Sequence, residues 1–221
     1  MPAPKPADPA DSRSSRPSPG KRPGKPAAKA VRPARKPARK PGKVYQLKVS
    51  LNDLRPAVWR RLLVRETCSL ARLHGIIQIA MGWQDSHLHL FTFDGRRFGN
   101  PRLLDLADLA PESIQLRKVL TQPKQRMFYT YDMGDNWHHQ VVLEAIQEAH
   151  PRATFPKCID GARACPPEDV GGPPGYSEFL KAMRNPRNPN HRHYLAWYGG
   201  RFDPEHFAIS SVNKRLQPLK R

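Results

Sequence analysis

The stretch that decides the fold is Val44-Tyr45-Gln46-Leu47-Lys48-Val49-Ser50-Leu51. Its apolar side chains alternate with polar ones, which is the pattern of a strand with one buried face. Asn52-Asp53 and the following Pro56 form a turn signal, and residues 58–64 have the composition of a second strand. The folded part of the chain is therefore expected to begin near Val44 with two consecutive strands.

A helix is predicted next. Ser69 is a good N-cap residue, and Gly82 is a good terminator. Between them, apolar residues recur at helical spacing through about Met81: Leu70, Leu73, Ile77 and Ala80. This is the one helix expected in the first half of the chain.

Strands dominate the first half of the chain, whereas helices gather at its end. Residues 151–176 are rich in Pro and Gly and show no periodicity. The other expected strands cover residues 87–93, a return after Asp94-Gly95, 127–132 and 137–145, and the expected helices cover about 114–120, 177–184 (capped by Ser177), 189–197 and 204–216. This order favours an α+β fold with a mainly antiparallel sheet.

The chain is strongly basic, and its first 43 residues differ from the rest. The net charge is +19 over 221 residues. Residues 1–43 contain 13 Lys/Arg, 2 Asp and 11 Pro, whereas residues 44–221 contain 25 Lys/Arg and 17 Asp/Glu. A segment with so few apolar residues cannot offset its ordering entropy, so we expect a disordered tail before a single domain of residues 44–221.

The tail has two interpretations. Its Lys and Arg side chains can displace counterions from phosphates, which makes it a candidate arm for nucleic acid. The candidate contacts are Lys21, Arg22, Lys25, Arg32, Arg35, Lys36, Arg39 and Lys40. Alternatively, the tail only keeps the protein in solution and has no specific target.

No membrane partner is expected, because neither a signal-peptide pattern nor a run of about 18 apolar residues occurs. The three cysteines are Cys68, Cys158 and Cys165, an odd number. A reducing cytoplasm, in which these cysteines are thiols, is the predicted location.

A His-x-His pair is the first candidate for chemistry. His87 and His89 are two positions apart on an expected strand, so both side chains should lie on one face. Such a pair can supply two ligands to Zn²⁺ or a similar divalent ion, with Asp135 and His138 as further metal candidates. Alternatively, the two histidines are ordinary sheet residues that bond to their neighbours.

The turn at Asp132-Met133-Gly134-Asp135-Asn136 is the second candidate. Gly134 is expected to supply a positive φ, and Asp132 or Asp135 is a candidate metal ligand or general base with His138 as its partner. His139 falls on the opposite face and is expected to be packed. Alternatively, the carboxylates only satisfy backbone donors of the turn.

The third candidate is Cys165-Pro166-Pro167-Glu168-Asp169, which precedes a Gly-rich reversal. Glu168 and Asp169 can bind a cation or accept hydrogen bonds from arginine, for which Arg60 and Arg61 are available. Those arginines can instead contact phosphates. Cys165 is a weaker candidate nucleophile, and His74 is expected to be a core histidine. Alternatively, this segment is a loop packed on the sheet.

Several of these segments together resemble the plasmid pRi open-reading-frame-three-like family, proteins of the insertion-element passenger type. The matching segments are Pro56 to Arg61, Leu73 to Trp83, His87 to His89, Tyr131 to His138, Ala164 to Gly172 and Trp197 to Phe207. Met133 departs from the family pattern, which usually has Phe there. The resemblance implies an α+β fold and an association with mobile elements, but no particular reaction.

Three functions are therefore expected in order of preference. The first is an accessory protein that binds nucleic acid through its basic arm. The second is a metal-dependent hydrolase or nuclease that uses His87, His89, Asp132, Asp135 and His138, with Glu168 and Asp169 nearby. The third is a protein-interaction module in which the same motifs are architectural. The sequence has no P-loop, GxGxxG, GxSxG or HExxH motif.

Overall fold

The computed structural model describes residues 42–220 and begins with the two predicted strands. β1 (Lys43–Leu51) and β2 (Trp59–Arg65) pair antiparallel, with Leu47 opposite Leu62. The alternating apolar side chains of β1 from Tyr45 to Leu51 are buried in the main core, and the polar side chains between them are only partly buried. Val44 packs in a separate small cluster with Ala149 and Phe155. The alternation in the sequence thus fixes which face of the sheet is covered.

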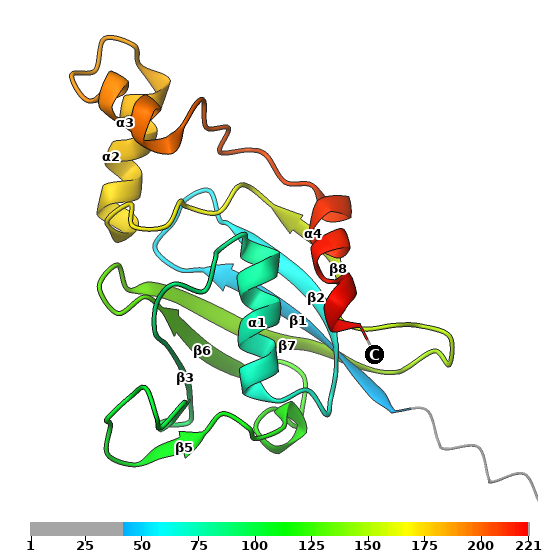
Figure 1. Cartoon of the computed structure of the whole chain (residues 1–221). Helices are drawn as coiled ribbons and strands as arrows, with labels where there is room; N and C mark the ends of the chain where they lie inside the picture. Colours follow the sequence, from blue (N-terminus) through cyan, green and yellow to red (C-terminus); the bar gives the residue numbers. More distant parts are fainter. Residues whose placement is uncertain (1–41, 221) are drawn as a thin grey trace, which may run out of the picture. The chain divides into compact units, whose positions relative to one another are not determined.

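Within the described residues, eight strands form one sheet in the order β5-β4-β3-β6-β7-β1-β2-β8 (Figure 1). The six further strands are β3 (His89–Phe93), β4 (Arg96–Gly99), β5 (Leu109–Pro111), β6 (Arg126–Tyr131), β7 (Trp137–Glu148) and β8 (Lys157–Ala162). All neighbours pair antiparallel except β4 and β5, which are parallel. The predicted α+β fold with a mainly antiparallel sheet is confirmed.

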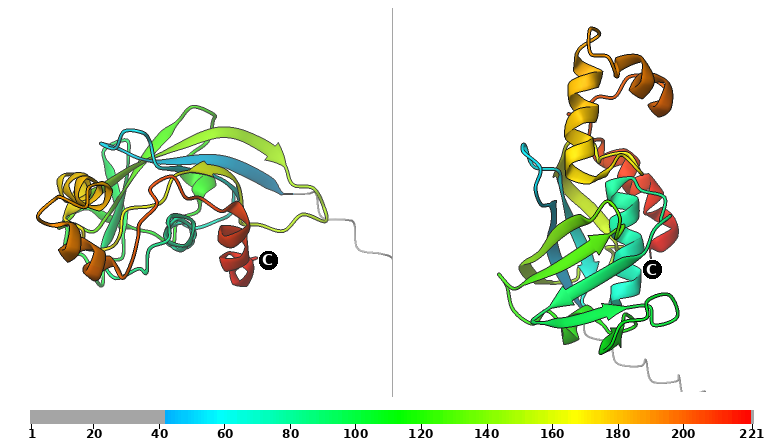
Figure 2. Two further views of the ribbon diagram at one scale, coloured as in Figure 1. Left: turned by 90° about the horizontal axis from the view of Figure 1, so that it is seen from above. Right: turned by 90° about the vertical axis from the view of Figure 1, so that its left-hand side faces the viewer.

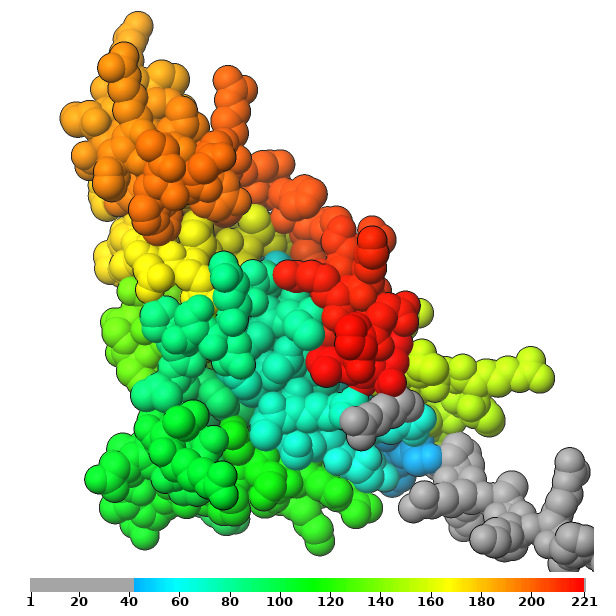
Figure 3. All heavy atoms as spheres, viewed as in Figure 1, coloured from blue at the N-terminus to red at the C-terminus, as the bar shows by residue number. Residues whose placement is uncertain are grey.

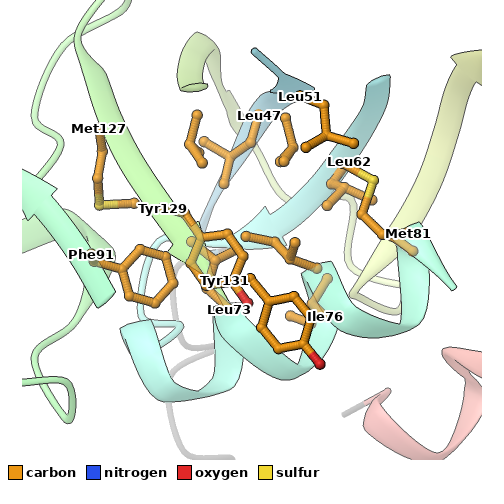
Figure 4. Close-up of a cluster of buried hydrophobic side chains, with 14 of the residues drawn as sticks. Leu47, Leu51, Leu62, Leu73, Ile76, Met81, Phe91, Met127, Tyr129 and Tyr131 are labelled. Carbon is orange, nitrogen blue, oxygen red and sulfur yellow. The ribbon is translucent and has the colours of Figure 1, made fainter. Parts of the chain in front are cut away.

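The helix α1 (Leu70–Met81) covers one face of the sheet. Ser69 caps it by accepting a hydrogen bond from the backbone of Arg72, and Gly82 ends it at a φ of 115°. Figure 4 shows the core between α1 and the strands, where residues such as Ile76 meet the aromatic rings of β6. Seen from above, α1 and α4 (Ile209–Arg215) lie on the same side of the sheet (Figure 2).

The C-terminal helices differ from the prediction at their starts. α2 (Gly172–Arg184) begins before the predicted cap Ser177, because Gly171 takes a left-handed conformation with a φ of 89° and two prolines fit the first turn. α3 (His191–Tyr198) lies close to its predicted place. The predicted start of α4 at residue 204 is wrong, since Asp203 caps a separate turn by accepting from the Glu205 backbone.

The strands β5 and β8 and the two short 3-10 turns were not predicted. β8 lies in a segment without periodicity and pairs with β2, and the three residues of β5 are too few for a pattern. The predicted helix near residues 114–120 is a single 3-10 turn, Leu116–Lys118, and a second one follows α4 at Gln217–Leu219. β3 starts at His89 rather than at residue 87.

None of the helices in the described part of the chain has the length and apolar character that crossing a bilayer requires. The predicted tail, with its eight basic candidates between residues 21 and 40, lies outside the described residues apart from its last two positions.

Candidate functional site

Three segments far apart in the sequence meet around His87. It lies in the loop between α1 and β3, and its Nε2 atom faces the turn between β6 and β7 and the loop before α2. The distances from this atom are 3.0 Å to Asp169 Oδ1, 3.6 Å to Asp132 Oδ2 and 3.9 Å to Glu168 Oε2. The Nε2 atom is buried and makes no hydrogen bond to any residue that the structure describes. We call these four residues the His87 cluster.

The turn after β6 holds Asp132 in a strained conformation. Positive φ values fall on Asp132 (57°) and Asn136 (54°), and Gly134, which was expected to need one, does not have it. Asp132 Oδ1 accepts from the backbone N–H groups of Gly134 (2.9 Å) and Asp135 (3.2 Å). One oxygen of Asp132 therefore satisfies backbone donors of the turn, which was one of the two alternatives, and Oδ2 remains directed at His87.

Glu168 is positioned by two hydrogen-bond donors. The Tyr131 hydroxyl donates to its carboxylate at 3.0 Å, and the Gln84 backbone N–H donates at 2.8 Å. The same hydroxyl accepts from the Ser86 backbone at 3.0 Å. Burial raises the pKa of Tyr131 well above its usual range, so the phenol keeps its proton and stays a donor. One tyrosine thus connects the loop that carries His87 to the loop that carries Glu168.

Asp135 does not join the His87 cluster. Its Oδ2 atom accepts from the Gly171 backbone N–H at 3.0 Å, which connects the turn to the start of α2. At Gly172 the φ is 65°, and a Cβ atom there would lie 2.5 Å from the carbonyl oxygen of Asp135. The two segments therefore approach each other more closely than any residue other than glycine allows.

The structure separates the two histidines that the sequence grouped. His87 precedes the strand, whereas His89 begins it and bonds through Nε2 to Glu112 Oε2 at 2.7 Å. His89 also stacks on His74, whose Nε2 lies 2.7 Å from Asp85 Oδ1. Among the described residues, no group of metal-ligand atoms within 4.8 Å of one another contains both His87 and His89.

His138 and His139 follow the predicted alternation on β7. His138 contacts Thr130 across the strands and belongs neither to the His87 cluster nor to the group of His74, Asp85 and His89. His139 is fully buried, and its Nδ1 lies within 3.1 Å of two backbone carbonyl oxygens, those of Tyr129 and Trp137. The expectation that His139 is the packed histidine is thus confirmed.

Two groups contribute residues to one cleft of about 570 Å³: the His87 cluster is the first, and the stacked His74 and His89 with their carboxylate partners are the second. Its lining includes His87 from the first group and His74, Asp85, His89 and Glu112 from the second, together with Ser86, Leu88, Asn100 and Leu103. Sequence reasoning did not identify Asp85, Glu112 or Tyr131, because single acidic or aromatic residues carry no spacing signal. His74 is buried as predicted, but it also lines this cleft.

Arg60 and Arg61, the predicted partners of the acidic loop, bond to other groups. Arg60 is buried and donates to four backbone carbonyl oxygens, including those of Ala80 and Ala162. Arg61 pairs with Glu144 and Asp160, both at 2.7 Å. Neither arginine therefore contacts the acidic loop, and within residues 42–220 no Lys or Arg forms an ion pair with the carboxylates of the His87 cluster.

Cys165 does not have the environment of a nucleophile. Burial raises the pKa of its thiol well above the usual range, and the positive charge of Arg60 opposes this only partly. All three cysteines are free thiols.

Comparisons with known proteins agree with the fold and name no activity. A family model described as "Plasmid pRiA4b ORF-3-like protein" matches residues 43–211. The "Uncharacterized protein y4hQ" of Sinorhizobium fredii (strain NBRC 101917 / NGR234) is 35% identical over 179 residues, covering 80% of this chain and 92% of that protein. The crystal structure of the "Protein of Unknown Function MM3350" from Methanosarcina mazei Go1 matches with a TM-score of 0.72 and 35% identity, covering 77% of this chain and 97% of that one.

Proposed function

The chain belongs to the plasmid pRiA4b ORF-3-like family, and from its site we propose that it is a metal-dependent hydrolase. His87, Asp132 and Asp169 would bind one divalent cation, and Glu168 would act on the water that this cation activates. The observation that carries the proposal is the buried Nε2 atom of His87, which makes no hydrogen bond to a described residue although three carboxylate oxygens surround it.

The spacing of the atoms supports a cation. Metal–ligand bonds of about 2.1 Å place neighbouring ligand atoms roughly 3.0 to 3.4 Å apart in tetrahedral or octahedral geometry. The His87 Nε2 atom lies 3.0 Å from Asp169 Oδ1 and 3.6 Å from Asp132 Oδ2. An ion therefore fits between these atoms with only small side-chain movements.

The charge of the cluster supports the same conclusion. Three carboxylates that crowd together repel unless a cation offsets their charge. Among the described residues, the only basic group paired with them is His87 itself. One nitrogen and two oxygens form a ligand set that suits Mn²⁺, Fe²⁺ or Zn²⁺.

Three protein ligands leave open coordination positions for water and substrate. A bound cation would lower the pKa of its water, and Glu168 would accept the proton that this water loses. The resulting hydroxide would attack an ester, amide or phosphoester, and the proton would leave with the departing group. Asp135 and His138, which were also candidates, would support the turn and the strand instead of binding the ion.

The direct test is elemental analysis of the full chain purified without chelators, together with titration of Mn²⁺ and Zn²⁺. We expect one ion per chain, with loss of that ion in His87→Ala and Asp169→Asn. His138→Ala is the matched control, because it removes a partly exposed histidine that lies on β7 outside the cluster, and it should keep the ion. Absence of uptake by the native chain, or equal uptake by His87→Ala, would refute the proposal.

The charge of the chain favours a second function, binding of nucleic acid by the basic arm in a mobile-element context. Residues 1–43 carry 13 Lys/Arg against 2 Asp, and residues 44–221 are also net basic. Deleting residues 1–43 should weaken binding to DNA or RNA and flatten its salt dependence. Unchanged affinity at low salt would exclude the arm.

The free thiols are consistent with the reducing cytoplasm that the sequence predicts.

A further inference from the structure

The helices α2 and α3 form a lobe that extends from the sheet, shown in yellow and orange in Figures 1 and 3. Its aromatic side chains cluster around the fully buried Phe179, and they are Tyr176, Tyr194, Trp197, Tyr198 and Phe202. In the sequence these residues are spread over 27 positions, residues 176–202, with Tyr176 and Phe179 on α2 and with Tyr194, Trp197 and Tyr198 at helical spacing on α3. The fold brings them together on one lobe.

Two of these rings combine a fixed position with an open surface. The ring centroids of Trp197 and Tyr198 lie 5.9 Å and 5.8 Å from that of Phe179, in edge-on contact. Both residues nevertheless remain 42% exposed. Contact through ring edges holds each ring in place without covering all of its surface. Such rings can stack on a planar ligand with little loss of conformational entropy.

The same lobe is basic. Arg184, Arg187, Arg192 and Arg201 are exposed, and within residues 42–220 none of them forms an ion pair with a carboxylate. Lys181 is the exception, because it pairs with Glu178 at 2.8 Å. Four guanidinium groups without an ion pair among the described residues, on the same lobe as the open aromatic rings, favour a ligand that has both negative charge and planar apolar rings.

We propose that the lobe of α2 and α3 binds single-stranded nucleic acid, with bases stacked on Trp197 and Tyr198 and phosphates contacting the arginines. Stacking on aromatic side chains combined with a positive surface is how single strands are bound without sequence preference. A duplex hides the faces of its bases, so it cannot use the rings. An apolar protein surface would fit the rings but would leave the arginine charges unpaired.

The position of the lobe adds to this inference. A cleft of about 480 Å³ lies between Trp197, Tyr198 and Phe202 on one side and the loops of Gln84 and Glu168 on the other. A strand bound to the lobe would therefore pass beside Glu168 of the His87 cluster. If this strand is also the substrate, the bond that is cleaved is a phosphodiester. That assignment rests on the proposed hydrolase function.

The test is fluorescence anisotropy of a labelled oligothymidylate with the full chain, in EDTA and at about 0.2 M salt, where the electrostatic share of binding is reduced. Trp197→Ala should weaken binding at least about fivefold, as expected for the loss of one stacked base. Trp197→Phe should restore most of the affinity. Phe128→Ala is the matched control, because Phe128 is also an exposed aromatic residue (40%) but lies on β6, and it should bind like the native chain.

A duplex of the same length provides the second comparison, and its affinity should be equal for the native chain and Trp197→Ala. Equal oligothymidylate affinity of Trp197→Ala and Phe128→Ala would overturn the proposal, and so would an equal loss for single strand and duplex. Because EDTA removes any metal, this outcome does not depend on the hydrolase proposal. The metal content of Trp197→Ala, measured separately, should remain that of the native chain.

Discussion

The imidazole rings of His74 and His89 lie face to face, with their centroids 3.5 Å apart and their planes 6° from parallel. Each ring bonds to its own carboxylate, Asp85 for His74 and Glu112 for His89. Burial, and then the charge of His89, lower the pKa of His74. The stack is therefore most stable with His74 neutral, because two adjacent charged rings would repel.

The hydrogen bonds of His74 also determine where its one proton lies. The Tyr129 hydroxyl accepts from Gln78 Nε2 at 2.9 Å, so its own proton is directed to His74 Nδ1 at 2.8 Å. His74 must then carry its proton on Nε2 and donate it to Asp85. We expect ¹⁵N NMR to report the Nε2–H tautomer for His74. The opposite tautomer would contradict this chain of hydrogen bonds.

Removing the Tyr129 hydroxyl tests the same chain through stability. Tyr129→Phe should lower the free energy of unfolding by about 1–3 kcal/mol, because it leaves buried groups of His74 and Gln78 without partners. Tyr198→Phe, which removes the hydroxyl of an exposed tyrosine, should change it little. Denaturant unfolding measures both. Equal stability of the two variants would show that the hydroxyl of Tyr129 is dispensable.

The contact between Gly172 and Asp135 allows a separate prediction. Gly172→Ala should be more destabilising than Gly95→Ala, although both glycines have positive φ values, 65° and 71°. At Gly95 a Cβ atom meets nothing within 4 Å, so that variant pays only the conformational cost of about 1–2 kcal/mol. At Gly172 the Cβ atom also meets the Asp135 carbonyl oxygen at 2.5 Å. Equal melting temperatures for the two variants would contradict the close approach.

The fold was largely predictable because its early elements follow their own periodicity. The strand beginning at Val44 and the helix from Leu70 to Met81 have the expected buried faces. β8 was not predictable, since its pairing with β2 depends on contacts remote in the sequence, such as Phe207 against Gly161. Local patterns carry no information about such contacts.

The candidate site was predictable in its parts but not in its grouping. His87, Asp132, Glu168 and Asp169 were all singled out from the sequence, and the fold brings them together. His89 was grouped with His87 by strand alternation, which fails because the strand starts only at His89. Its actual partner, Glu112, lies in a segment that shows no periodicity.

Tyr131 should affect metal binding without being a ligand. Its hydroxyl accepts from the backbone of Ser86, the residue before the proposed ligand His87, and so helps to orient that ligand, while it also donates to Glu168. Under the proposed function, Tyr131→Phe should weaken metal affinity by about 10- to 100-fold while the stoichiometry stays at one ion per chain, as is typical of residues that orient ligands. Calorimetric titration measures both quantities. Unchanged affinity would mean that the ligands are oriented without this hydroxyl.

His139 should make stability depend on pH. Burial lowers the pKa of His139 to about 3, whereas in an unfolded chain its pKa is near the ordinary histidine value of 6.5. Between these values the unfolded state binds the proton and the folded state does not. The contribution to stability is therefore complete above about pH 6.5 and is lost as the pH falls toward 3, by up to about 1.4 kcal/mol per pH unit.

His139→Asn isolates this effect, because the asparagine side-chain N–H can replace the Nδ1–H donor to the Tyr129 and Trp137 carbonyl groups but does not titrate. The variant should be less stable than the native protein at neutral pH, since the smaller side chain packs less well in the core. As the pH falls from about 7 to about 4, the stability difference between the two proteins should shrink. Subtracting the two free energies of unfolding removes the contribution of the carboxylates, which titrate in both proteins. A difference that stays constant over this range would mean that His139 takes up its proton without unfolding.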